Sequence, residues 1–177
     1  KDIAVFLFDE SGVMAGPWLA AGYECWIVDA KHPVAYDNCG VTSEGRLKKV
    51  HADLTRSWMP PFDVSRVAFV GAFPPCDHLA VSGARWFKGK GLRKLETSIA
   101  MFATAAEFCE WVGAPYFIEN PVSNISSHWR KPDFKFHPHH YTKFCLEDNY
   151  TKQTCLWTGN GFQMPPACIA DDMGEPD

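Results

Sequence analysis

The chain has 177 residues, of which 46% are apolar, enough to build the core of one domain. Its formal net charge of −4 excludes a global positive field that would draw the chain to nucleic acid. No apolar run reaches the ~20 residues of a membrane span, and seven scattered cysteines without a Cys-x-x-Cys pair favour a reducing, cytoplasmic location.

The N-terminal segment predicts a strand, a turn, a helix and a second strand. An apolar run at residues 3–8, typical of a first strand rather than a signal peptide, leads through residues 9–18 into a helix that closes at Gly22. The second strand, residues 23–28, ends at Asp29. Backbone N–H groups in such a turn and a carboxylate about twenty positions later suit a nucleoside. A generic strand–helix–strand unit with a solvated aspartate is the alternative.

Two further strands follow in the first half of the chain. Residues 31–45 are polar and rich in turn formers, whereas residues 49–52 predict a short strand that ends at Asp53. A connection with two prolines, residues 57–63, leads to an apolar run at residues 66–70 that predicts a buried strand. The alternation of strands and connections indicates an α/β fold.

A cysteine follows this buried strand on a stiff turn. We expect Gly71 to end the strand, Pro74 and Pro75 to fix the backbone, and Cys76 to lie at the tip. Ligands of open α/β sheets bind beyond the carboxyl ends of strands, so Cys76 is a candidate nucleophile. The alternative is a small buried apolar residue, because free cysteine is among the most buried residue types.

Residues 80–94 are the one locally basic segment of this acidic chain, and they also contain glycines and the aromatic pair Trp86 and Phe87. Glycines make a loop mobile, cations meet phosphates, and aromatic rings stack on bases. An ordinary solvated loop is the alternative. The candidate substrate or nucleic-acid contacts are Ser82, Arg85, Lys88 and Lys90, together with Asn120.

The second half begins with a helix and a strand. Apolar residues recur at helical spacing over residues 92–112 and predict a helix closed by Gly113. The strand at residues 115–118 ends in Glu119, so a second strand end carries an ionisable group. Residues 122–177 are rich in turns, histidines and aromatics and are expected to be irregular. Their His and Cys spacing fits no familiar zinc pattern, so no metal is expected.

These motifs, in this order, resemble the DNA cytosine methyltransferases that act at carbon 5, above all their short phage-encoded members. Pro-Pro-Cys precedes Glu-Asn-Pro, with a basic glycine-bearing loop and a helix between them. The matching segments cover nearly the whole chain: residues 7–14, 17–18, 21–24, Asp29 with His32, 74–87, 119–121 and 152–157.

The resemblance implies a Rossmann-like class I S-adenosylmethionine-dependent methyltransferase fold, with a mostly parallel sheet and helices on both faces. The single domain, residues 1–177, would comprise a cofactor half (1–70), a catalytic loop, helix and Glu-Asn-Pro strand (71–121) and a C-terminal segment (122–177). Cys76 would be the nucleophile and Glu119 would contact the base. The residues expected to face S-adenosylmethionine are Phe8, Glu10, Gly12, Asp29 at the ribose, Asp53 at the adenine amino group, and Pro74.

Three features depart from the full-length family. The first turn reads Phe-Asp-Glu-Ser-Gly rather than Phe-x-Gly-x-Gly-Gly. The Gln-x-Arg-x-Arg motif is not found, which leaves Arg130, Lys152 and Arg85 as open substitutes. The stretch after Glu119 is too short for a separate target-recognition domain, so specificity is expected to be low, unnecessary, or supplied by a recognition subunit or a homodimer partner.

The leading expectation is methyl transfer to carbon 5 of cytosine in DNA through a covalent cysteine adduct, with the base flipped out of the duplex, inside a bacterial or phage-infected cell. A second hypothesis keeps this chemistry but applies it to a free pyrimidine nucleotide or to a modified cofactor. A third is an inactive module that binds the cofactor or a host protein.

Overall fold

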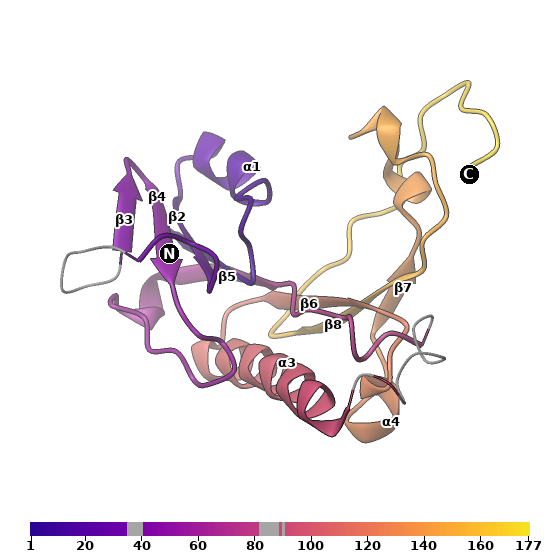
Figure 1. Ribbon diagram of the computed structural model, residues 1–177. Helices are drawn as coiled ribbons and strands as arrows, with labels where there is room; N and C mark the ends of the chain where they lie inside the picture. Colours follow the sequence, from indigo (N-terminus) through magenta and orange to yellow (C-terminus); the bar gives the residue numbers. More distant parts are fainter. Residues whose placement is uncertain (35–40, 82–88, 90) are drawn as a thin grey trace.

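The computed structural model describes residues 1–34, 41–81, 89 and 91–177 (Figure 1). Its strands are β1 (Ile3–Leu7), β2 (Glu24–Asp29), β3 (Val41–Glu44), β4 (Leu47–His51), β5 (Val67–Ala72), β6 (Tyr116–Pro121), β7 (Phe134–Phe136) and β8 (Thr154–Gly159). Its helices are α1 (Ala15–Ala20), α3 (Leu92–Val112) and α4 (Ile125–His128), with short 3-10 turns η1 (Val64–Arg66), η3 (Pro138–Tyr141) and η4 (Leu146–Asp148).

All eight strands form one mixed sheet in the order β3-β4-β2-β1-β5-β6-β8-β7. The five neighbours from β4 to β6 are parallel, whereas β8 runs antiparallel to both β6 and β7, and β3 runs antiparallel to β4. The chain moves outward from β1 in both directions, which leaves a topological switch point between β1 and β5. The α/β architecture is therefore as expected, and it is compatible with a Rossmann-like fold.

Helices cover both faces of the sheet, as α1 above and α3 below it show in Figure 1. Successive side chains of β1 point to opposite faces. Val5 and Leu7 share a buried core with Phe102 of α3, whereas Phe6 packs in a second core with Ala15 of α1. The sheet thus lies between two apolar layers.

The helix expected at residues 92–112 is confirmed with those bounds as α3. Phe102, Phe108 and Cys109 recur at helical spacing and are buried against the sheet. Gly113 ends the helix in the left-handed conformation at φ 68°, and its N–H donates to the Cys109 carbonyl. Among the helices of the described segments, none combines the length and apolar character needed to cross a lipid bilayer.

Gly71 was expected to end the fifth strand, but β5 continues through it to Ala72. A Cβ at this position would lie 3.0 Å from a ring carbon of Phe6 and 3.4 Å from one of Phe117. The glycine therefore makes room for two aromatic rings, and the strand ends where Phe73 and the prolines begin.

Three other expectations were wrong. The polar sequence of β3 was expected to be turn, but it pairs with β4 as an edge strand. Glu119 was expected at the end of its strand, but it lies within β6, which runs on to Pro121. The segment 122–177 is not wholly irregular, because β8 inserts between β6 and β7 and its Trp157 is fully buried.

Candidate active site

The candidate residues gather along one edge of the sheet. Parallel strands end at a common edge, and the register pairs Leu7 with Ala72 and Ala72 with Ile118. Along this edge lie Asp53 after β4, Asp29 at the end of β2, Phe8, Glu10 and Gly12 after β1, Pro74 and Cys76 after β5, and Glu119 and Asn120 in β6. The candidates at the ends of β4, β2 and β1 adjoin those after β5 and in β6 at the switch point between β1 and β5, where such sheets bind ligands.

The turn that carries Cys76 is fixed by backbone hydrogen bonds. The Phe73 N–H donates to the Leu7 carbonyl at 3.0 Å, which holds the turn beside β1. The Cys76 carbonyl accepts from the N–H groups of Leu79 and Ala80, each at 2.9 Å. Cys76 itself is half-buried rather than packed in the interior.

Asn120 joins this turn to β6. Its side-chain amide is fully buried and donates to the Pro74 carbonyl at 2.8 Å. The segments beyond the two strands are also paired, since the Val81 N–H donates to Val122 and the Asn124 N–H donates to Leu79. The thiol turn and the strand of Glu119 therefore form one connected unit.

Three charged groups act on the Cys76 thiol. Burial raises the pKa of Cys76, and the charges of Asp77 and Glu119 raise it further, whereas Lys152 opposes them. Burial also raises the pKa of the Glu119 carboxyl, again with Lys152 opposing. At neutral pH the thiol is mostly protonated, and Glu119 holds its proton more readily than an ordinary glutamate.

Aromatic side chains line two cavities that Glu119 also lines. A cavity of about 260 Å³ is lined by Glu119 and Lys152 together with Phe73, Phe136, Tyr141 and Tyr150. A second cavity of about 440 Å³ on the α1 face of the sheet shares Phe73, Glu119, Phe136 and Tyr141 with the first. The two are thus contiguous, and a planar ring that reached Glu119 would meet aromatic faces.

The turn after β1 is held by a buried aspartate. Oδ1 of Asp9 accepts from the Gly12 N–H at 2.7 Å and from the Ser11 hydroxyl at 3.1 Å. Phe8 and Gly12 both adopt positive φ, 60° and 71°. A Cβ on Gly12 would lie 3.2 Å from Ile27, so glycine is required by conformation and by space.

The carboxylates of the cofactor half lie at the ends of β2 and β4. Asp29 accepts from the Lys31 N–H at 2.8 Å. Asp53 accepts from the N–H and the hydroxyl of Thr55, and these bonds lower the pKa of Asp53. Glu10 forms an exposed ion pair with Lys31 at 2.7 Å, so its carboxylate lies at the surface.

Sequence reasoning did not assign roles to two histidines that connect these strand ends. Nε2 of buried His32 donates to the Asp9 carbonyl at 2.9 Å, and Nδ1 of His51 donates to the His32 carbonyl at 2.8 Å. The pair ties the β1 turn to the ends of β2 and β4. His32 was visible only as part of the family resemblance, and nothing in the sequence marked His51.

Two of the three candidate substitutes for the missing arginine motif, Arg130 and Lys152, lie in the described residues, and the structure places them near opposite ends of β8. Arg130 donates to the Asp133 carboxylate and to the Thr158 carbonyl, near the far end of β8. Lys152 precedes the other end of β8 and acts on both Cys76 and Glu119. Of the candidates in the described residues, Lys152 is therefore the one whose charge acts on Cys76 and Glu119.

Part of the expected site lies outside the described residues, namely Ser82, Arg85, Lys88 and Lys90. Over the ranges that the structure does describe, no group of three or more His, Cys, Asp or Glu side chains is arranged to hold a metal ion. The rings of His137, His139 and His140 instead contact one another, with centroids 4.4–5.6 Å apart.

The charges around Cys76 predict its reactivity. Iodoacetamide should modify Cys76 faster as pH rises, because only the thiolate reacts and its pKa is raised. Glu119→Gln should speed the reaction and Lys152→Ala should slow it, each roughly two- to tenfold. Peptide mass spectrometry follows Cys76, with exposed Cys145 as an internal reference. Equal rates in all three proteins would show that neither charge acts on the thiol.

The Asn120 amide should be a stability determinant. Asn120→Ala leaves the buried Pro74 carbonyl without its donor and should lower the free energy of unfolding by about 1–3 kcal/mol. Asn149→Ala is the matched control, because its amide also donates to a carbonyl but lies exposed. Urea unfolding of both variants makes the comparison, and equal losses would contradict a special role for the buried link.

Comparison of the sequence with models of protein families found no match, and comparison with curated proteins found none either.

Proposed function

We propose that this protein transfers a methyl group from S-adenosylmethionine to carbon 5 of cytosine in DNA, through a covalent adduct with Cys76. The observation that carries the proposal is that the turn bearing Cys76 follows β5 and Glu119 lies in the adjacent parallel strand β6, with the charge of Glu119 acting on the thiol. Glu119 lines an aromatic-walled cavity. A thiol and a carboxyl group are the groups needed to add to a pyrimidine ring and to protonate it.

The topology supports the proposal. The parallel strands β4-β2-β1-β5-β6 follow the order 3-2-1-4-5 of a nucleotide-binding sheet. Beyond β6, antiparallel β8 is inserted before β7, and β7 runs in the same direction as the five parallel strands. The strand order, with helices on both faces, is compatible with a Rossmann-like methyltransferase fold.

The residues at the strand ends fit the adenosine part of S-adenosylmethionine. Asp29 and Asp53 are carboxylate acceptors on neighbouring strands, suited to ribose hydroxyls and to an amino group. The glycine turn at Gly12 brings backbone beside them, and Pro74 lies next to that turn across β1 and β5. When bound, the cofactor supplies an electrophilic methyl group on a sulfonium.

The chain's own residues would act in sequence. Cys76 loses its proton to solvent and its sulfur bonds to carbon 6 of cytosine, while Glu119 donates its proton to the N3 edge. Electron density then moves to carbon 5, which becomes the nucleophile towards the methyl group. Once carbon 5 has taken the methyl group, a base would remove the carbon 5 proton, the bond from sulfur to carbon 6 would break to return the thiolate, and the N3 proton would return to the Glu119 carboxylate. The raised pKa of Glu119 suits a carboxyl that must enter this cycle protonated.

The test is transfer of a labelled methyl group to three substrates, namely duplex DNA, single-stranded DNA and deoxycytidine monophosphate. The proposal predicts label on cytosine in duplex DNA. The net charge of −4 favours a second candidate, the free nucleotide, which would be labelled in place of DNA. Calorimetric binding of S-adenosylmethionine with no label on any substrate would replace both with a cofactor-binding module.

A further inference from the structure

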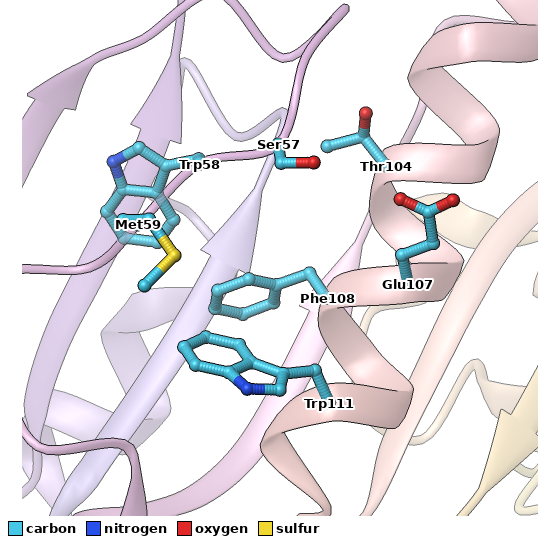
Figure 2. Close-up of a pocket in the computed structure, with 7 residues that line it drawn as sticks. All are labelled: Ser57, Trp58, Met59, Thr104, Glu107, Phe108 and Trp111. Atoms are coloured by element: carbon cyan, nitrogen blue, oxygen red, sulfur yellow. The ribbon is translucent and has the colours of Figure 1, made fainter.

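A separate cavity of about 270 Å³ lies on the α3 face of the sheet (Figure 2). One wall is the connection after β4, with Ser57, Trp58 and Met59, and the other wall is the C-terminal half of α3. That connection returns to the start of β5, and α3 ends beside the start of β6. The cavity is therefore displaced from the carboxyl-end edge that holds Cys76, and the proposed methyl transfer leaves it without a role.

Aromatic faces at different inclinations line one side of this cavity. The ring centroids of Trp58 and Phe108 are 5.5 Å apart at 34°, and those of Phe108 and Trp111 are 6.0 Å apart at 63°. Phe108 is buried, but Trp111 is 51% exposed, an uncommon position for the largest apolar side chain. The three rings thus contact one another in series along one side of the cavity, and Trp111 is open to solvent.

The opposite side is polar and negative. In Figure 2 the ends of Ser57, Thr104 and Glu107 lie together, across the cavity from the rings of Phe108 and Trp111. The Glu107 side chain is exposed and ends in a carboxylate. None of the described residues that line the cavity is basic. An anion would therefore be repelled, and a purely apolar ligand would leave the carboxylate unused.

We propose that this cavity binds a small organic cation, an ammonium group that carries N-methyl groups. Its methyl groups would lie against the faces of Trp58, Phe108 and Trp111, and its charge would lie towards Glu107. Aromatic cages recognise methylated ammonium ions because the negative ring faces attract the spread positive charge. The polarisable thioether of Met59 adds a further apolar contact at the rim.

Choline and two relatives test the proposal. 3,3-Dimethylbutan-1-ol has the shape of choline without its charge, and ethanolamine has the charge without the methyl groups. Each is titrated at constant ionic strength into protein labelled with ¹⁵N at tryptophan. Choline should shift the indole resonances of Trp58 and Trp111 and bind at least roughly tenfold more tightly than either relative. Trp18, which packs on the other face of the sheet, is the internal reference and should not shift.

Substitutions at the exposed residues Glu107 and Trp111 test the site without disturbing the folded core. Glu107→Gln and Trp111→Ala should each weaken choline binding by roughly three- to tenfold, and Trp111→Phe should retain most of it. Glu96→Gln, an exposed glutamate near the other end of α3, should change nothing. Equal binding of choline and the neutral alcohol, or undiminished binding by Glu107→Gln, would overturn the proposal. The choline-binding result does not depend on methyl transfer, which Glu107→Gln and Trp111→Ala should retain.

Discussion

Cys76→Ala should abolish transfer of labelled methyl groups to cytosine, with a loss of more than about 10⁴-fold. The reason is that carbon 5 of cytosine becomes nucleophilic only after sulfur has added to carbon 6, and alanine cannot add. The measurement is initial-rate incorporation of label into duplex DNA at saturating cofactor. Since Cys76 is only half-buried, the fold should survive the change, as circular dichroism can verify.

The matched control for this variant is Cys145→Ala, because Cys145 is a free and exposed cysteine in the same chain. It should transfer methyl groups at the wild-type rate. Cofactor binding by calorimetry should also be similar in the two variants, since neither cysteine lies at the ends of β2 or β4. Label transfer by Cys76→Ala at more than a small fraction of the wild-type rate would remove Cys76 as the nucleophile.

Glu119→Gln should lower the rate of methyl transfer by about 10²- to 10⁴-fold. The amide keeps the size of the side chain but cannot give a proton to the base. The same change removes a negative charge that raises the pKa of Cys76, so alkylation of the thiol should become faster. Slower methyl transfer together with faster alkylation of Cys76 indicates that the variant has lost an acid. Structural damage is not expected to slow one rate and speed the other.

The pH profile gives this prediction a second signature. The reaction requires Glu119 to be protonated and Cys76 to be ionised. The ordinary pKa of a glutamate lies far below that of a cysteine, so between the two pKa values most molecules hold Glu119 ionised and Cys76 protonated. Between the two pKa values each unit of pH that increases the thiolate also decreases protonated Glu119, so the wild-type rate should be nearly flat. In Glu119→Gln the rate should instead rise with pH across that window. A rising wild-type profile would contradict a proton-donating Glu119.

Local patterns allowed much of the fold to be predicted. The bounds of α3 followed from helical spacing and from Gly113, which ends the helix in a left-handed conformation. The gathering of Asp29, Cys76 and Glu119 at one edge followed from a general property, that parallel strands end together. Neither inference required knowledge of which strands are neighbours.

What the sequence could not predict depends on contacts between distant segments. The place of β8 between β6 and β7 brings Lys152 to the site, and no local pattern sets that order. Gly71 resembles a strand terminator, yet its role is set by the rings of Phe6 and Phe117 from neighbouring strands. The bond from Asn120 to Pro74 likewise joins β6 to the turn after β5, and neither sequence gives a sign of it.

The most direct test of the account is a trapped adduct on DNA that carries 5-fluorocytosine. Fluorine at carbon 5 cannot leave as a proton does, so the sulfur–carbon bond should persist after methyl transfer. Mass spectrometry should then find the added nucleotide on the tryptic peptide that spans residues 67–85, whose single cysteine is Cys76. The account predicts this adduct in the wild type and none in Cys76→Ser. An adduct on another cysteine, or equal trapping by Cys76→Ser, would contradict it.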